Sequence, residues 1–295
     1  MELTINSLTK EFQGFSAVSD VSYTMKNGVY GLLGVNGAGK TTFMRMLCTL
    51  LQPSAGSILC DGQDIFAMGA EYRKFLGYLP QEFGYYPDFT VEDYLMYIAL
   101  IKGVHKAVAK KRVQELIAQV GLSKVRKKKM RKLSGGMKRR AGIAQAMVNQ
   151  PEILILDEPT AGLDPNERIR FRNLLSEFAQ DRLVLLSTHI VSDVESVANE
   201  ILLMKGGELL HSGTPEEIIQ SAPDRAWRLT LSREEAGKVY RQYQVSNSRI
   251  VPEGMELRVL AKESPHPEAV KEELTLEDVF LSYFGEKAGE EDAIL

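Results

Sequence analysis

The feature that most constrains the fold of this chain is a glycine-rich segment, residues 34–41, which fits the pattern G-x-x-x-x-G-K-[ST]. The apolar run that leads into it, 28–34, is typical of a buried strand, and the stretch that begins at Thr42 is typical of a helix. Glycines let consecutive backbone N–H groups point inward around phosphate oxygens, and the following helix adds its positive N-terminal end. The segment therefore predicts a phosphate-binding loop between a strand and a helix, with a nucleotide as its ligand.

Two side chains of this loop have predicted roles in phosphate chemistry. Lys40 can bridge the β- and γ-phosphates of a nucleoside triphosphate, and the hydroxyl of Thr41 can ligate Mg²⁺. The other loop residues predicted to contact the nucleotide are Gly34, Asn36, Gly37, Ala38, Gly39 and Thr42. The loop therefore predicts a nucleoside triphosphate with magnesium.

An acidic pair supplies the second half of the predicted nucleotide site. The continuous apolar run 153–156 suits a strand that is buried on both faces of a parallel sheet, and Asp157 and Glu158 follow it directly. A carboxylate at the end of such a strand can hold the magnesium shell, and its neighbour can polarise an attacking water. We therefore predict that Asp157 is a magnesium ligand and that Glu158 is a catalytic residue.

A third motif, Leu-Ser-Gly-Gly-Met at residues 133–137, predicts a second anion-binding site. Ser134 can begin a helix, and its hydroxyl together with the amides of Gly135 and Gly136 can bind a phosphate at that helix start. One nucleotide seldom needs two such cradles from the same subunit. The motif is therefore predicted to serve the nucleotide of a neighbouring subunit.

Together these motifs resemble, in kind and in order, those of the ATP-binding subunit of ABC transporters, over roughly residues 1–220. The resemblance implies ATP and Mg²⁺ as cofactors. It also implies that Gln81 contacts magnesium and senses a membrane partner, and that His189 contacts the γ-phosphate. Phe12 matches an aromatic residue that stacks on adenine, and residues 161–164 match a loop at the seam of a dimer.

The order of strand and helix patterns predicts an α/β fold. The resemblance implies a P-loop NTPase (RecA-like) core with an N-terminal antiparallel β subdomain, the whole ATPase domain spanning residues 1–220. Mostly helical patterns from about 85 to 150 predict an α-helical signature subdomain within it. Alternating apolar residues predict a small α+β C-terminal accessory domain at 225–285, and an acidic tail follows at 286–295.

The resemblance also implies partners. A separate transmembrane permease is expected, with two ATP-binding subunits that form a homodimer through their ATP sites, although the motif ends in Met137 where the family usually has glutamine, which leaves a heterodimer open. The segment 275–280 resembles the ending of subunits that serve ABC-2-type exporters and favours export over import. The expected localisation is cytoplasmic, peripheral on the inner face of the cell membrane through the permease.

Composition is consistent with these expectations. The chain has 295 residues, of which 44 % are hydrophobic and 25 % charged, as in soluble globular proteins. Two cysteines are too few for a disulfide framework and suit a reducing cytosol. The longest apolar runs are far shorter than the roughly 18–20 residues that span a bilayer, and the N-terminus lacks a signal-peptide pattern.

Other classes of P-loop protein explain the sequence less well. An ordinary kinase or GTPase does not account for residues 133–136 or for His189. A soluble ABC-type ATPase of translation or DNA maintenance is the alternative function, but such proteins usually carry two cassettes or long coiled coils. A basic run, 124–132, could suggest nucleic acid, but charge runs are usually solvated faces and the net charge is −3, so no nucleic acid is expected.

Overall fold

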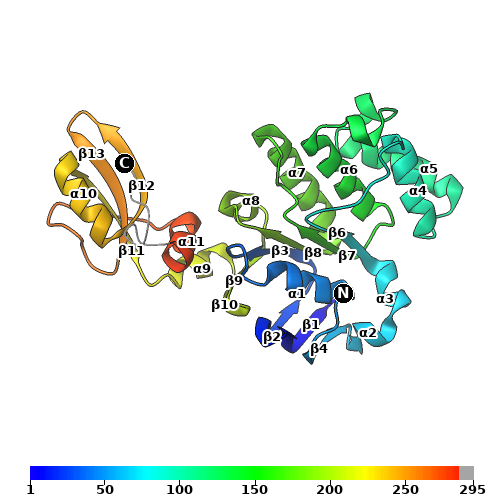
Figure 1. Cartoon of the computed structure of the whole chain (residues 1–295), viewed down its shortest axis with the longest axis horizontal. Helices are drawn as coiled ribbons and strands as arrows, with labels where there is room; N and C mark the ends of the chain where they lie inside the picture. Colours follow the sequence, from blue (N-terminus) through cyan, green and yellow to red (C-terminus); the bar gives the residue numbers. More distant parts are fainter. Residues whose placement is uncertain (286–295) are drawn as a thin grey trace. The chain divides into compact units, whose positions relative to one another are not determined.

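The computed structural model describes residues 1–285 of the chain, and the predicted acidic tail, 286–295, lies outside the described residues. The chain divides into two units, Met1–Ser212 and Gly213–Leu295. The division comes earlier than residue 220, where the sequence predicts the end of the ATPase domain. The reason is that helix α9 (Pro215–Gln220) packs against the last helix, α11 (Leu276–Phe284), and so belongs to the second unit (Figure 1).

The first unit is built on a six-stranded sheet of order β10-β9-β3-β8-β7-β6. Its strands are β3 (Gly28–Leu33), β6 (Leu76–Leu79), β7 (Ile153–Asp157), β8 (Leu183–Thr188), β9 (Glu200–Lys205) and β10 (Glu208–Gly213). The strand pairings from β9 through β3, β8 and β7 to β6 are all parallel. Every residue of β7 and β8 is buried, as continuous apolar strands in a parallel sheet require. The predicted α/β fold is thereby confirmed.

A second sheet in this unit is antiparallel and has the order β2-β1-β4-β5. Its strands are β1 (Leu3–Phe12), β2 (Phe15–Met25), β4 (Ala55–Cys60) and β5 (Gln63–Asp64). Apolar residues of β1, β2 and β4 join one hydrophobic cluster with residues of helix α1 and of the central sheet. This sheet is the N-terminal antiparallel β subdomain that the resemblance implies.

The helices of the first unit fall into two groups. The helices outside the helical subdomain are α1 (Lys40–Leu47), α2 (Ile65–Met68), α3 (Ala70–Phe75), α7 (Pro165–Phe178) and α8 (Val191–Glu195), of which α1, α7 and α8 each follow a strand of the central sheet. The helical subdomain consists of α4 (Val91–Ile101), α5 (Lys106–Gln119) and α6 (Gly135–Met147), which pack on one another (Figure 1). Short 3-10 turns lie at Ser123–Val125, Met130–Lys132 and Ala179–Asp181. Within residues 1–285, no helix combines the length and the apolar character that a membrane crossing needs.

The second unit contains a four-stranded antiparallel sheet of order β12-β13-β11-β14. Its strands are β11 (Arg225–Leu231), β12 (Gln244–Val251), β13 (Gly254–Ala261) and β14 (Val270–Glu272). Helix α10 (Arg233–Gln242) adds Ala236 and Val239 to a core formed by Leu229, Leu231, Leu257 and Val259. Alternate residues of β11 and β13 thus point into this core, as their apolar alternation predicts.

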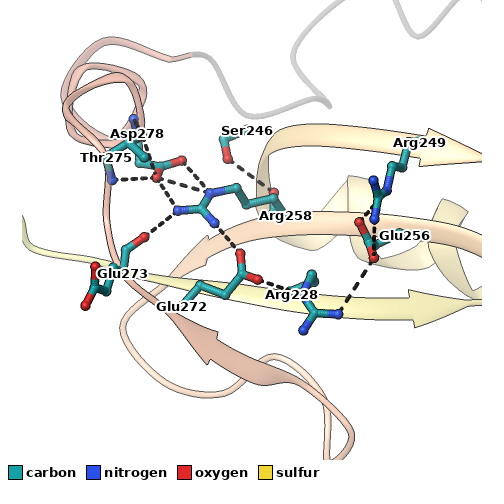
Figure 2. A network of polar contacts seen from close by, with 9 residues as sticks. All are labelled: Arg228, Ser246, Arg249, Glu256, Arg258, Glu272, Glu273, Thr275 and Asp278. Atoms are coloured by element: carbon teal, nitrogen blue, oxygen red, sulfur yellow. Dashed lines mark hydrogen bonds and ion pairs between the residues drawn. The ribbon is translucent and has the colours of Figure 1, made fainter.

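The other face of this sheet carries a chain of alternating charges (Figure 2). Arg228 of β11 lies directly opposite Arg258 of β13, a pairing that is unfavourable by itself. Glu272 of β14 relieves the repulsion because it pairs with Arg228 at 2.6 Å and also with Arg258. Arg258 in turn donates to Asp278 at 2.7 Å, and Arg249 pairs with Glu256 at 2.6 Å. The chain of ion pairs therefore runs from the sheet to the start of α11.

Asp278 is the most buried member of this network, since its side chain is only 3 % exposed. It also completes a capping box at the start of α11, in which Thr275 Oγ1 accepts from the Asp278 N–H at 3.2 Å. Burial by itself would raise the pKa of Asp278, but hydrogen bonds from Arg258 and Thr275 outweigh it and keep that pKa below its ordinary value. The carboxylate is thus held charged by Arg258 of β13 and by Thr275 at the start of α11.

We expect Arg258→Met to destabilise the second unit by about 2–3 kcal/mol, because it leaves the buried Asp278 carboxylate without its cation. Trp227 in β11 is the only tryptophan of the chain, so its fluorescence during a urea titration reports on this unit. An unfolding midpoint equal to that of the wild type would contradict the structural role of Arg258.

Arg249→Met is the matched control, because the side chain of Arg249 is 70 % exposed although its ion pair with Glu256 is just as short. It should cost less than about 1 kcal/mol of stability.

In the wild type, the contribution of Asp278 to the stability of the second unit is present above the pKa that this residue has in the unfolded chain. It is lost as the pH falls through the depressed pKa of the folded state, because protonation then removes the charge.

Candidate functional site

The glycine-rich loop leads from β3 into α1, as the sequence predicts. Gly39 caps α1 with a φ of 99°, and no side chain caps this helix, so its first N–H groups remain available to an anion. A Cβ atom at Gly39 would come within 2.3 Å of the carbonyl oxygen of Ala17 in β2. Glycine is therefore required at this position both by the left-handed backbone and by the close approach of β2.

Lys40 turns back over its own loop. Its Nζ donates to the carbonyl oxygen of Gly34 at 2.6 Å and to that of Val35 at 3.0 Å, and the residue is only 7 % exposed. Burial lowers the pKa of Lys40, while the nearby carboxylates of Glu158 and Asp157 raise it and offset part of that effect. A cation in this position is close enough to the loop to meet the phosphates that the loop would bind.

The carboxylate of Asp157, at the end of β7, is hydrogen-bonded to helix α1 and to strand β8. Its Oδ2 accepts a hydrogen bond from Thr41 Oγ1 at 2.9 Å, and its Oδ1 accepts one from Ser187 Oγ at 2.6 Å. Asp157 and Ser187 are partners across the parallel strands β7 and β8. The structure therefore brings together the two residues, Thr41 and Asp157, that are predicted from separate motifs to hold magnesium.

These oxygen donors fit a magnesium ion. Mg²⁺ prefers hydroxyl and carboxylate oxygens, and in phosphate-binding sites it usually takes only one or two protein ligands beside phosphates and waters. No group of three or more His, Cys, Asp or Glu side chains within the described part of the chain is arranged to hold a metal. The residues at Thr41 and Asp157 thus suit an ion that is shared with a nucleotide.

Glu158 and His189 form a second pair beside this position. Nδ1 of His189 lies 3.1 Å and 3.0 Å from the two carboxylate oxygens of Glu158. The Glu158 side chain is only 7 % exposed, whereas that of His189 is 55 % exposed. A carboxylate and an imidazole in contact can hold and move a proton, so the geometry is compatible with a base and a residue that orients it.

A pocket of about 430 Å³ lies over the loop. It is lined by Phe15, Ala17, Asn36, Gly37, Ala38, Gly39, Lys40, Thr41, Thr42, Gln81, Asp157 and Glu158. Most of the predicted site residues from the loop, the acidic pair and Gln81 therefore meet in one place. Gly34 does not line it, because this glycine is buried beneath the loop, where a Cβ atom would come within 2.3 Å of the carbonyl oxygen of Met204.

The aromatic wall of the pocket differs from the sequence prediction. Phe15 lines the pocket, whereas the predicted adenine contact, Phe12, does not. The two residues are directly opposite each other at the end of the β1–β2 hairpin, and both rings are exposed. Lys10 Nζ lies 5.1 Å from the centre of the Phe12 ring. The resemblance selects Phe12, and the sequence gives no sign that Phe15 lines the pocket, because only the hairpin places the two rings side by side.

The third motif, residues 133–137, lies at the start of helix α6. Ser134 is its N-cap, and the serine hydroxyl accepts from the Met137 N–H at 3.2 Å. A Cβ atom at Gly136 would come within 2.6 Å of a carboxylate oxygen of Glu167 in α7. Ser134 and Gly136, like Gly135, do not line the pocket of their own chain. The structure thus separates this helix start from the loop pocket.

Two pocket residues and one supporting residue were not predicted from the sequence. Phe15 and Ala17 line the pocket because β2 runs beside the loop. Ser187 is fully buried, and it donates to Asp157 and accepts from the N–H of Glu158 at 3.0 Å. The one sequence signal for Ser187 is that a polar residue stands near the end of an apolar strand. Neighbouring parallel strands end at the same edge of the sheet, so such a residue can lie beside Asp157.

The fold and the loop together define a P-loop nucleotide-binding protein, and comparisons with known proteins identify its family. Residues 18–161 match the family described as ABC transporter. The uncharacterized ABC transporter ATP-binding protein YxlF of Bacillus subtilis (strain 168) is 35 % identical over 236 residues, which cover 80 % of this chain and 78 % of YxlF. This chain belongs to the ABC transporter ATP-binding proteins, and it is an ATP-hydrolysing subunit that powers transport.

Two further comparisons agree with that identification. The probable multidrug ABC transporter ATP-binding protein YbhF of Escherichia coli (strain K12) is 35 % identical over 277 residues, which cover 91 % of this chain but 47 % of YbhF. A solved structure described as the ATP binding subunit of an ABC transporter superposes with a TM-score of 0.69 at 26 % identity, and covers 75 % of this chain and 92 % of that one. The resemblance stated from the motifs is therefore confirmed.

The resemblance assigns the adenine contact to Phe12, so we expect Phe12→Ala to weaken ATP binding by about 5- to 150-fold, because the loss of one aromatic stack on a base costs about 1–3 kcal/mol. Binding of a fluorescent ATP analogue measures the change. Phe15→Ala is the comparison, since it removes an equal ring from the opposite residue of the same hairpin. Unchanged affinity for Phe12→Ala with weakened binding for Phe15→Ala would assign the adenine contact to Phe15.

Proposed function

We propose that two copies of this chain close around ATP and that this closure, followed by hydrolysis, drives export through a separate membrane permease. One observation carries the proposal: Ser134 and the glycines after it form a helix start that does not line the pocket of their own chain. A helix N-terminus with a serine cap and two glycines can bind phosphate oxygens. The ligand that best suits it is the γ-phosphate of ATP on a second copy.

In this proposal the loop residues Asn36, Gly37, Ala38, Gly39 and Thr42 surround the phosphates, and Gly34 provides the close packing beneath them. Lys40 contacts the β- and γ-phosphates. Thr41, Asp157 and Gln81 hold Mg²⁺, which when bound neutralises charge on the phosphate oxygens. The adjacent hydroxyl, carboxylate and amide in one pocket support this set of ligands.

Glu158 acts as the base that polarises the attacking water, and His189 contacts the γ-phosphate and orients the base. The contact of 3.0 Å between His189 Nδ1 and the Glu158 carboxylate supports this pairing. An imidazole that is half exposed can turn between the carboxylate and a phosphate. Hydrogen bonds that strengthen as charge develops on the γ-phosphate would lower the barrier to hydrolysis.

Closure follows from the affinity of ATP for both surfaces. Charge-assisted hydrogen bonds from Ser134, Gly135 and Gly136 to the γ-phosphate form only when the two copies meet, so ATP favours the closed dimer. Hydrolysis removes the shared phosphate and allows the copies to part. Met137 replaces the usual glutamine at the end of this motif, but its side chain leaves the serine cap intact. A heterodimer with a related chain would use the same geometry.

The permease partner and the direction of transport rest on the relatives and on the C-terminal unit. YbhF is named a probable multidrug transporter protein, and it covers most of this chain, including the accessory unit. Thr275 and Asp278 form a capping box at α11, and the segment 275–280 resembles the ending of subunits that serve ABC-2-type exporters. We therefore assign this chain to export, on the inner face of the membrane at the permease.

The first test is Glu158→Gln. This variant should bind ATP as the wild type does, lower the turnover number by about 10²- to 10⁴-fold because the base is lost, and accumulate a dimer with ATP. Phosphate release and light scattering during gel filtration measure the two effects. Glu208→Gln is the control, since it makes the same charge change at an exposed position of β10. Near-normal turnover in Glu158→Gln would refute the role of this residue.

The second test addresses the sharing of the site between copies. Ser134→Arg should abolish turnover but leave ATP binding by the monomer intact, because an arginine at this position obstructs only the opposite copy. In the Glu158→Gln background it should also prevent the dimer. Ser123→Arg, at an exposed position of the same subdomain, controls for the added charge and bulk. An equal loss of ATP affinity in the monomer would show instead that Ser134 serves its own nucleotide.

A further inference from the structure

Arg139 of helix α6 is almost fully buried, with 6 % of its surface exposed, yet none of the predicted roles uses it. Its five N–H groups all donate to main-chain carbonyl oxygens from two segments of the nucleotide site. Nε donates once, at 3.3 Å, and each Nη donates twice, at distances that include 2.6, 2.8 and 3.0 Å. The acceptors are the carbonyl oxygens of Pro80, Gln81, Asp157, Glu158 and Pro159.

This set of contacts requires an arginine. A guanidinium has five N–H donors in a fixed plane, whereas a lysine ammonium has three, so only arginine satisfies all five carbonyls at once. A buried cation is costly unless its donors are paired, and here every donor is paired. Burial lowers the pKa of Arg139, while Asp157 and Glu158 raise it, and the group remains a cation.

The main chain at Glu158 needs such support. Glu158 has a φ of 49°, a left-handed conformation that residues other than glycine adopt only when their surroundings impose it. Two contacts impose it here: Ser187 Oγ accepts from the Glu158 N–H at 3.0 Å, and Arg139 Nη2 donates to the Glu158 carbonyl at 2.6 Å. The direction of the Glu158 side chain follows from this backbone conformation.

Arg139 also joins the main chain at Glu158 to helix α6. It lies on α6 about one and a half turns after Ser134, which begins that helix. The same guanidinium reaches the carbonyl of Gln81, whose side chain lines the pocket. One side chain thus connects the helix that carries Ser134 with the main chain of two residues that line the pocket.

We infer that Arg139 is a positioning residue for ATP hydrolysis: it fixes the main chain at Glu158 so that the carboxylate points at the attacking water, and it ties that geometry to helix α6. This inference rests on the proposed role of Glu158 as the base. Arg139 does not line the pocket over the loop. It acts through Glu158, so its loss affects turnover while the phosphate contacts of the loop remain.

The variants Arg139→Lys and Arg139→Met in the full-length chain test this inference. Turnover should fall by about 10- to 100-fold in Arg139→Lys, since a misplaced catalytic group costs about that much, and further in Arg139→Met. The Kd of a fluorescent ATP analogue should stay within about twofold, because the pocket contacts are unchanged. Lys138→Met is the control, because it removes the positive charge of the neighbouring residue on the same helix. The Nζ of Lys138 lies 5.1 Å from the centre of the Tyr85 ring, and this variant should leave turnover unchanged.

A double-mutant cycle separates positioning from a general structural effect. In the Glu158→Gln background the carboxylate that Arg139 aims is gone, so adding Arg139→Lys should change the residual turnover by less than about twofold. The same 10- to 100-fold loss in both backgrounds, or an unchanged turnover in Arg139→Lys alone, would overturn the role of Arg139 and leave that of Glu158 standing. Normal turnover in Glu158→Gln alone would overturn both. If Arg139→Met fails to fold, Arg139→Lys decides.

Discussion

The nucleotide site depends on the hydrogen bonds made by one buried carboxylate, that of Asp157. The residue is 1 % exposed, and its oxygens accept from Thr41 at the start of α1 and from Ser187 at the end of β8. A charge so deep in the protein is tolerated only with such partners. These hydrogen bonds hold helix α1 against strands β7 and β8, and Asp157 lines the same pocket as the phosphate-binding loop and Glu158.

The residue next to Asp157, Glu158, has a strained backbone conformation, and it is the residue proposed to act as the catalytic base. The left-handed conformation at Glu158 is held at its N–H by Ser187 and at its carbonyl by Arg139. Neither of these side chains needs to contact a nucleotide to matter. The side chain of Arg139 connects the acidic pair with helix α6, because it donates to the main-chain carbonyls of Asp157 and Glu158.

The accessory unit shows a different balance between sequence and structure. The alternation of apolar and polar residues in β11 and β13 is enough to predict two half-buried strands, and the capping box at Thr275 and Asp278 is enough to predict the start of α11. The ion pairs that link Arg228, Glu272 and Arg258 could not be predicted, because they depend on which strands are neighbours and in which register.

The sequence by itself determined the α/β class, the phosphate loop, the acidic pair and the order of the motifs, because each is a local pattern: strand periodicity, glycines that free the backbone, and polar residues at the ends of apolar runs. Only the tertiary structure decided that Phe15 faces the pocket, that Ser187 supports Asp157, and that Arg139 reaches five carbonyls. These contacts join segments that are far apart in the chain. Such segments are brought together by the order of the strands and the packing of the helices, and no local sequence pattern encodes either.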